Sequence, residues 1–346
     1  MKKSMMTLAA LLTAVALTSC SNDSFDEKTS LLTPSNQEIL FSTGVQTRGA
    51  AFTSSDPNSV TPFKVFAYQH TGGASYINGG VITWDGTKTA YVPDNTYYWP
   101  ESGSLDFLAV YPSDVTFATV PSAYNSFAYT ASTTIGNQVD LMVATATNLS
   151  KTDGNVALAF SHLLSQISVQ AKVSTNLQVE ISDVTFHNLQ PTGTFDGTVL
   201  SASGTVTNYS ISMASPQTLT QAGGTVDLTG TNVLLLIPQT VTAWDKTGTA
   251  STNTTNSYIT ATIAVKSADG GTTLLASGDV YFPVAIAWTA GKHYTYTLNF
   301  GDATSPTANG VGYQDNGSDV TLTGATKITF STTVTGWDDV AVPVTF

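Results

Sequence analysis

The chain of 346 residues contains a single cysteine, Cys20, which is the first residue to consider for covalent chemistry. A lone thiol can be a catalytic nucleophile or a small buried apolar residue. Cys20, however, follows an apolar run from Leu8 to Leu17, which itself follows the positively charged start Met1-Lys2-Lys3. A run of about ten apolar residues has the length of a signal-peptide core and is too short to span a bilayer.

The segment Leu17-Thr18-Ser19-Cys20 resembles the bacterial lipobox, in which cleavage precedes the cysteine and the sulfur is acylated. We therefore expect residues 1–20 to be a lipoprotein signal peptide and Cys20 to anchor the chain in the outer membrane through lipid. The acidic stretch from Ser21 to Glu27 resembles an export signal of surface lipoproteins, although a solvated tether has the same composition. The sequence thus predicts a surface-exposed outer-membrane lipoprotein that has no disulfide.

Arg48 is the only arginine, and the other eleven cationic side chains are lysines. It stands between the polar tether and the first strand-rich region. A chain built in this way can be cut once by an Arg-specific protease, although a charge-poor sequence can also lack arginine by chance. We expect proteolytic maturation between Arg48 and Gly49.

Side chains with the spacing of a catalytic or metal site are not evident in the sequence. The histidines are scattered, at positions 70, 162, 187 and 293, and no nucleophile-elbow or phosphate-loop motif is present. Asp106 and Asp140 are possible members of a carboxylate pair, but we expect them to cap turns or to accept backbone hydrogen bonds. A loop with Asp302, Asp315 and Asp319 lacks the calcium-binding spacing of an EF-hand. The chain is therefore predicted not to be an enzyme and to need no metal or cofactor.

The charge of the chain limits its partners. The net charge is −12 and only 10% of residues are charged, so the clustered cations that nucleic acid requires are missing. Tryptophan side chains can stack on sugars, but core packing is the usual role of tryptophan in β-sandwiches. The residues concerned are Trp84, Trp99, Trp244, Trp288 and Trp337.

Thr, Ser, Val, Gly and Asn dominate the composition, which suits strands and tight turns and disfavours long helices. Short apolar runs between Gly and Pro residues predict strands at 38–42, 63–68, 97–99, 105–111, 141–144, 156–160, 162–172, 233–237, 259–265, 281–285, 294–300, 327–334 and 340–346. We expect an all-β fold of two tandem β-sandwich domains of transthyretin-like or Greek-key type. The expected organisation is signal peptide 1–20, tether and removable strand 21–48, first domain 49–190 and second domain 191–346.

Several segments together resemble the fimbrillins, pilin-like surface lipoproteins of Bacteroides and related bacteria. The segments that carry the resemblance are Thr47-Arg48, Phe63-Lys64-Val65-Phe66-Ala67-Tyr68, Tyr97-Tyr98-Trp99-Pro100, Leu105-Asp106-Phe107-Leu108-Ala109-Val110-Tyr111-Pro112, Asp140-Leu141-Met142-Val143-Ala144, Phe160-Ser161-His162-Leu163-Leu164-Ser165-Gln166-Ile167 and Trp288-Thr289-Ala290-Gly291-Lys292-His293-Tyr294-Thr295-Tyr296-Thr297-Leu298. They extend along nearly the whole chain.

The resemblance implies a fimbrial subunit that is cleaved after Arg48 and then polymerises by donor-strand exchange, supporting adhesion. Its partners would be an Arg-specific protease and other copies or related subunits. The strand around Ile39, Leu40 and Phe41 would be removed, and a neighbour's strand would fill the groove.

The end of the chain holds the candidate donor strand, in which Val340, Val342, Val344 and Phe346 alternate at strand period. An ordinary edge strand is the alternative for this segment. Stalk, tip and anchor roles stay open, and so does a monomeric surface lipoprotein that binds host or dietary glycans.

Overall fold

The protein is described by a computed structural model that covers residues 34–47, 50–51, 60–230, 233–268, 271–301, 310–322 and 326–337. These residues form strands joined by turns, with single-turn 3₁₀ helices at Ile135–Asn137 (η1), Lys151–Asp153 (η2), Gln221–Gly223 (η3) and Ala250–Thr252 (η4). The predicted all-β fold with β-sandwich domains is confirmed. Within this part of the chain, no helix has the length and apolar character needed to cross a membrane.

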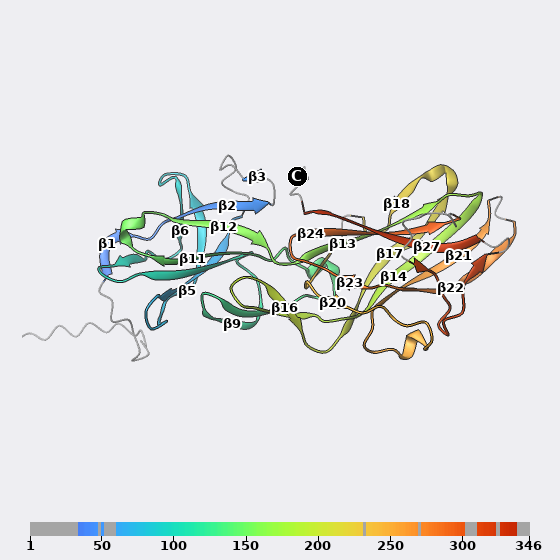
Figure 1. Ribbon diagram of the computed structural model, residues 1–346. Helices are drawn as coiled ribbons and strands as arrows, with labels where there is room; N and C mark the ends of the chain where they lie inside the picture. Colours follow the sequence, from blue (N-terminus) through green and yellow to red (C-terminus); the bar gives the residue numbers. More distant parts are fainter. Residues whose placement is uncertain are drawn as a thin grey trace, which may run out of the picture.

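The molecule is elongated, and the strands from the two ends of the sequence occupy its two ends (Figure 1). The chain passes from the first half to the second between β12 (Val156–His162) and β13 (Ser165–Val173). β12 belongs to a sheet of the first half, whereas β13 pairs with β24 (Lys292–Phe300) in the second half. The change of sheet therefore occurs at Leu163-Leu164.

The main sheet of the first half has the strand order β12-β11-β8-β4-β5-β6-β2-β3, and an additional β12–β2 pairing makes it close on itself. The other strands of this sheet are β2 (Phe41–Thr47), β3 (Ala50–Ala51), β4 (Phe63–Gln69), β5 (Ser75–Asp85), β6 (Ala90–Pro93), β8 (Leu105–Tyr111) and β11 (Met142–Leu149). Beside it, β1 (Pro34–Glu38) pairs with β7 (Tyr98–Pro100). Because β2 touches both β12 and β6, it is the strand that completes the ring.

A smaller four-stranded sheet covers the other face of β4 and β8. Its order is β16-β15-β10-β9, formed by β9 (Phe117–Ala123), β10 (Ser126–Thr130), β15 (Thr192–Phe195) and β16 (Leu200–Ser203). Phe66 and Leu108 on the main sheet and Phe127 on β10 belong to the apolar cluster between the two layers. The central strands β4 and β8 are thus buried on both faces, which explains their near-continuous apolar sequences.

The second half is a sandwich of two sheets. One follows the order β18-β13-β24-β27-β25, with β19 added to β13 and β26 added to β27, and the other follows β17-β14-β21-β22. The strands not yet delimited are β14 (Leu177–Leu189), β17 (Thr207–Thr220), β18 (Thr225–Asp227), β19 (Leu234–Leu236), β21 (Tyr258–Ser267), β22 (Thr273–Pro283), β25 (Gly310–Val311), β26 (Thr321–Leu322) and β27 (Thr326–Gly336). A separate short pair joins β20 (Thr240–Val241) to β23 (Ile286–Ala287).

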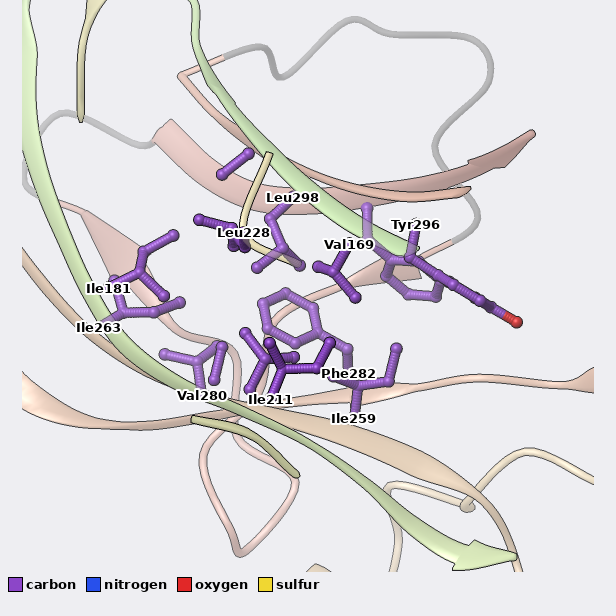
Figure 2. Close-up of a cluster of buried hydrophobic side chains, with 14 of the residues drawn as sticks. Val169, Ile181, Ile211, Leu228, Ile259, Ile263, Val280, Phe282, Tyr296 and Leu298 are labelled. Carbon is purple, nitrogen blue, oxygen red and sulfur yellow. The ribbon is translucent and has the colours of Figure 1, made fainter. Parts of the chain in front are cut away.

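The core of the second half lies between its two sheets, and Figure 2 shows the side chains that meet there. Val169 and Leu298 come from one sheet, and Ile181, Ile263 and Phe282 come from the other. All five are fully buried or nearly so. Each large aliphatic or aromatic side chain buried in this way contributes about 1.5–3 kcal/mol relative to exposure, so the second half has a complete core of its own.

The expected strand at 38–42 is corrected by the structure. Two strands, β1 and β2, replace it, with Ile39 and Leu40 between them. The interruption allows the Ile39 amide to donate a hydrogen bond to the carbonyl of Tyr97 at 2.8 Å, while the Leu40 carbonyl accepts one from the Val156 amide at 2.8 Å. The segment thus leaves the β7 side of the sheet and joins β12.

Candidate functional site

Strand β2, the segment just before Arg48, is an integral part of the first half. It runs parallel to β12, with a continuous register from Phe41 opposite Val156 to Val45 opposite Phe160. On its other side it meets β6 at a single antiparallel pair, Phe41 with Tyr91. The strand is therefore held mainly by β12 and only at one point by β6.

Side chains of this segment form part of the first core. Ile39 and Phe41 are both 0% exposed. The Phe41 ring makes edge-to-face contacts with Phe63, at a centroid distance of 6.5 Å, and with Phe107, at 6.0 Å. Aromatic pairs of this geometry add about 0.5–1.5 kcal/mol to the free energy gained from burial. The segment therefore fills the core, and its role exceeds that of a tether.

The contact with β6 is less complete than the contact with β12. Next to it, a cavity of about 200 Å³ separates residues 38–40, which immediately precede β2, from β6 and is lined in part by Glu38, Leu40 and Val92. Lys88 bridges the outer rim through an ion pair with Glu38. Because both partners are substantially exposed, such a pair contributes little to stability. The β6 side is the weaker boundary of β2.

The last described residue, Trp337, lies against the end of β12. Its ring stacks on His162 with a centroid distance of 4.2 Å and an interplanar angle of 14°. His162 Nδ1 lies 2.8 Å from Asp140 Oδ1, which orients the imidazole. The Trp337 amide donates to the Gly291 carbonyl at 3.2 Å. Strand β12 therefore contacts the N-terminal strand β2 along its length and the residue that follows β27 at its end.

The remaining candidates for chemistry have structural partners. Asp106 is buried and accepts hydrogen bonds from the Asn148 amide at 2.7 Å and from His70 Nδ1 at 2.9 Å, as a backbone-bonding carboxylate should. Asp315 accepts hydrogen bonds from the amide and the hydroxyl of Ser251, at 2.7 and 2.8 Å. Among the described residues, no three His, Cys, Asp or Glu side chains gather as metal ligands.

The other two histidines are shielded in the second half. Burial lowers the pKa of His187 to about 4, against a weaker opposing effect of Asp279. Its ring stacks on Tyr258 at 4.3 Å, and its Nε2 lies 2.8 Å from the Thr260 hydroxyl. Burial also lowers the pKa of His293, whose Nε2 lies 2.8 Å from the Ser168 hydroxyl. Both rings are neutral near pH 7 and join neighbouring strands.

Tryptophan side chains mainly fill cores. Trp99, Trp244 and Trp288 are 0%, 4% and 3% exposed. Trp84 and Trp337 are partly buried and pack against the first core and the inter-sheet cluster. Stacking on a sugar ring by the three buried tryptophans would need a rearrangement of the core.

Comparison with known proteins decides the family. A profile of fimbrillin-like proteins matches residues 47–337. The chain belongs to the fimbrillin-like family. The resemblance drawn from the sequence segments is thereby confirmed, and it covers both halves of this fimbrillin-like chain.

Solved structures share the fold of the fimbrillin-like chain. A fimbrial protein from Bacteroides vulgatus is 15% identical, with a TM-score of 0.60 and coverage of 88% of this chain and 100% of the other. A candidate cell adhesion protein from Bacteroides uniformis is 18% identical, with a TM-score of 0.50 and the same coverages. No curated protein matched the chain. At these identities the likeness concerns the fold alone.

The predicted site residues are only partly within the described chain. Ile39, Leu40 and Phe41 lie together between β12, β6 and β7. Cys20, Arg48, Gly49 and the candidate donor residues Val340, Val342, Val344 and Phe346 lie outside the described residues. The sequence reasoning missed the stacking of Trp337 on His162, because no local pattern brings together residues so far apart in the chain.

Proposed function

We propose that this fimbrillin-like protein is a structural subunit of a cell-surface fimbria and supports adhesion without enzymatic activity. The precursor is exported as a lipoprotein and anchored in the outer membrane through Cys20. An Arg-specific protease then cuts between Arg48 and Gly49. The matured subunit polymerises with other copies or related subunits by donor-strand exchange.

The observation that carries the proposal is the position of β2. The residues just before the proposed cleavage point pair with β12. Two side chains of this segment, Ile39 and Phe41, are completely buried. A cut after Arg48 separates β2 from the rest of the chain. The strand is then retained only by non-covalent contacts, of which those to β6 are few.

In the proposed mechanism, the departure of β2 leaves a groove beside β12 that accepts the strand of a neighbouring subunit. The edge of β12 loses its backbone partners from Val156 to Phe160, and Phe63 and Phe107 lose the ring that covers them. Unpaired backbone groups beside exposed apolar side chains favour pairing with another strand. The incoming strand must restore the hydrogen bonds to β12 and place large apolar side chains where Ile39 and Phe41 were.

The candidate donor is the C-terminal segment. Val340, Val342, Val344 and Phe346 alternate with smaller or polar residues and end in an aromatic side chain. A strand of this pattern presents one apolar face, which could take the place that Ile39 and Phe41 occupy in the precursor. The segment follows Trp337, whose ring stacks on His162.

The proposed organisation keeps the signal peptide at 1–20 and the removable segment at 21–48. The sequence predicts the two large domains at 49–190 and 191–346, whereas strand pairing favours a division near Leu163-Leu164. Both β13 and β14 precede residue 190 and pair with strands of the second half.

The test is cleavage of the soluble chain starting at Ser21 with an Arg-specific protease. We expect one cut, loss of the 21–48 fragment, and ladders on a denaturing gel run without boiling. The variant Arg48→Lys is the matched control and should remain uncut and monomeric.

A second variant separates the steps of assembly. A chain that ends at Trp337 should be cut normally and lose the fragment, yet form no ladder by itself. If the full chain is cut cleanly, releases the fragment and remains monomeric, self-polymerisation is refuted for this subunit.

A further inference from the structure

A cleft of about 410 Å³ opens beside the end of β10, away from β2 and β12. Its walls are the loop Asp114–Thr116, the strand end at Tyr129-Thr130 and the loop Ser132–Val139, which contains η1. Its volume falls within the range of about 300–1,000 Å³ that is typical of small-molecule sites. None of its lining residues takes part in the proposed strand exchange.

Hydrogen bonds hold the walls of the cleft in place. The Ala131 amide donates to the Pro191 carbonyl at 2.9 Å. The Gln138 side chain donates to the Ser132 carbonyl at 2.8 Å and accepts from the Leu235 amide at 2.7 Å. Since these contacts link the loop to two distant segments, the cleft exists without a ligand and needs little ordering to bind one.

The rim of the cleft offers uncharged polar groups. Thr116 and Asn137 are exposed, and within the described residues their side chains make no hydrogen bond. Ser132 and Thr130 add hydroxyl groups, and the partly buried Val139 adds an apolar wall. The lining combines donors and acceptors on flexible hydroxyl and amide groups with one apolar side.

Asp114 carries the only charge in the lining. It is exposed and makes no side-chain hydrogen bond within the described residues. A cleft with one carboxylate and no Lys, Arg or His disfavours phosphate and other anions. A cation held by aromatic faces is also disfavoured, because Tyr129 is the only aromatic lining residue and is 4% exposed.

We propose that this cleft binds one residue of a neutral sugar. The hydroxyl groups of a sugar can donate to the Asp114 carboxylate and exchange hydrogen bonds with Asn137 and Thr116, while a C–H face lies against the partly buried Val139. This inference goes beyond strand exchange and does not depend on it. It would give an individual subunit a contact with glycans.

The experiment uses the Arg48→Lys full chain, so that assembly plays no part. Saturation-transfer NMR is recorded with glucose, galactose, mannose, fucose and N-acetylglucosamine, and with phosphate and tetramethylammonium as charged probes. We expect transfer to at least one sugar and to neither ion. Transfer to none of the sugars, or to tetramethylammonium alone, overturns the proposal.

Gly136 provides a blocking variant that removes no side chain. A Cβ built on Gly136 meets no atom within 4 Å, so Gly136→Trp can fill the cleft without a backbone clash. Gly223→Trp is the matched control, because Gly223 also lies in a 3₁₀ turn and its Cβ would make only an ordinary contact, at 3.8 Å, with Thr220. Binding should disappear in the first variant and persist in the second.

Two single substitutions test the polar contacts assigned to the sugar. Asp114→Asn and Asn137→Ala should each weaken sugar binding by about tenfold, as expected for a lost polar contact. Asn155→Ala, at another exposed asparagine, should leave it unchanged. Binding that survives Gly136→Trp, or is equally weakened by Gly223→Trp, contradicts the assignment of the site.

Discussion

The two halves of the molecule complete their cores in different ways. In the second half, β24 is flanked by β27 over nine residue pairs and by β13 over eight, and all three strands lie after residue 164. In the first half, the closing strand β2 comes from upstream of Arg48 and shares five pairs with β12 and one with β6. The two halves thus differ in whether the strand that closes the core precedes or follows Arg48.

This difference gives the two halves different roles in the proposed assembly: the second half supplies a stable body, and the first half supplies the groove that a neighbour's strand would fill. Under the proposed maturation, a core enclosed by strands that follow Arg48 would stay complete after cleavage. A core closed by a strand that precedes Arg48 would become incomplete. The most direct test is a substitution in β2 that destabilises the first half in the uncut chain and has no effect once the segment that carries it has been removed.

The largest expected effect is that of Phe41→Ala in the uncut chain. Loss of this buried ring between Phe63 and Phe107 should destabilise the first half by about 3–5 kcal/mol. Hydrogen exchange of β8 amides measures that half, and exchange of β24 amides serves as the internal reference. Phe282→Ala, in the core of the second half, is the matched variant and should show the reverse pattern.

The same hydrogen-exchange measurement after cleavage distinguishes the two variants further. After release of residues 21–48, the chains with and without Phe41→Ala are identical and must exchange alike, whereas the defect of Phe282→Ala should persist. A Phe41→Ala chain that exchanges as slowly in β8 as the unchanged precursor would show that β2 contributes little to the first core.

A change of pH is expected to have a smaller effect, which concerns the stability of the second half. The pKa of His187 is about 4 in the folded chain because of burial and near 6.5 when unfolded. Between these values the unfolded chain binds more protons, so stability falls as pH falls from about 6.5 to 4. With a discount for partial exposure of the ring, the loss is on the order of 1–2 kcal/mol.

His187→Gln isolates this effect, because carboxylates also titrate in the lower part of the range. Urea unfolding at pH 7 and pH 4.5, followed through the second half, should show a smaller pH dependence in the variant. Equal dependence in both chains would mean that His187 is accessible to protons in the folded state. The lowered pKa of His293 acts in the same direction and leaves some dependence in the variant.

The smallest expected effect concerns the contact between the halves. Trp337→Ala removes the ring stacked on His162 and should cost about 1 kcal/mol. Faster exchange of the Trp337-proximal end of β27 and of His162 is the expected readout, with the core amides of both halves unchanged. Tyr98→Ala, at an exposed aromatic residue, is the control. A global loss of stability would instead assign Trp337 to the core.

The sequence allowed accurate prediction of strands that are apolar over a continuous run. The predicted strand at 105–111 coincides with β8, and that at 156–160 lies within β12. β8 is buried on both faces, which requires apolar side chains at nearly every position, whereas β12 alternates between buried and exposed residues and its exposed positions include Ala157 and Ala159. The strands β14 and β17 were missed because their outward faces carry Thr, Ser, Asp and His, which hide the inward alternation of Val, Ile and Phe.

The sequence located the segment that forms the candidate site, but it did not predict which strands that segment pairs with. The residues around Ile39 and Phe41 predicted a short strand, and the resemblance to the fimbrillins implied that this strand is removable. The parallel pairing with β12 could not be inferred, because strand direction depends on contacts between distant segments. The cleft at β10 was missed for the same reason, since its polar residues read as loop composition.

The antiparallel contact of β27 with β24 has a mechanical consequence for a filament. A force that pulls the end of β27 along the strand axis would act across its nine pairs with β24. The ladder is then loaded in shear, so many hydrogen bonds must break together rather than one after another. The stack of Trp337 on His162 would transfer part of the load to β12, the strand that receives the neighbour's strand in the proposed exchange. Tension would thus run through each subunit along ladders that resist it collectively.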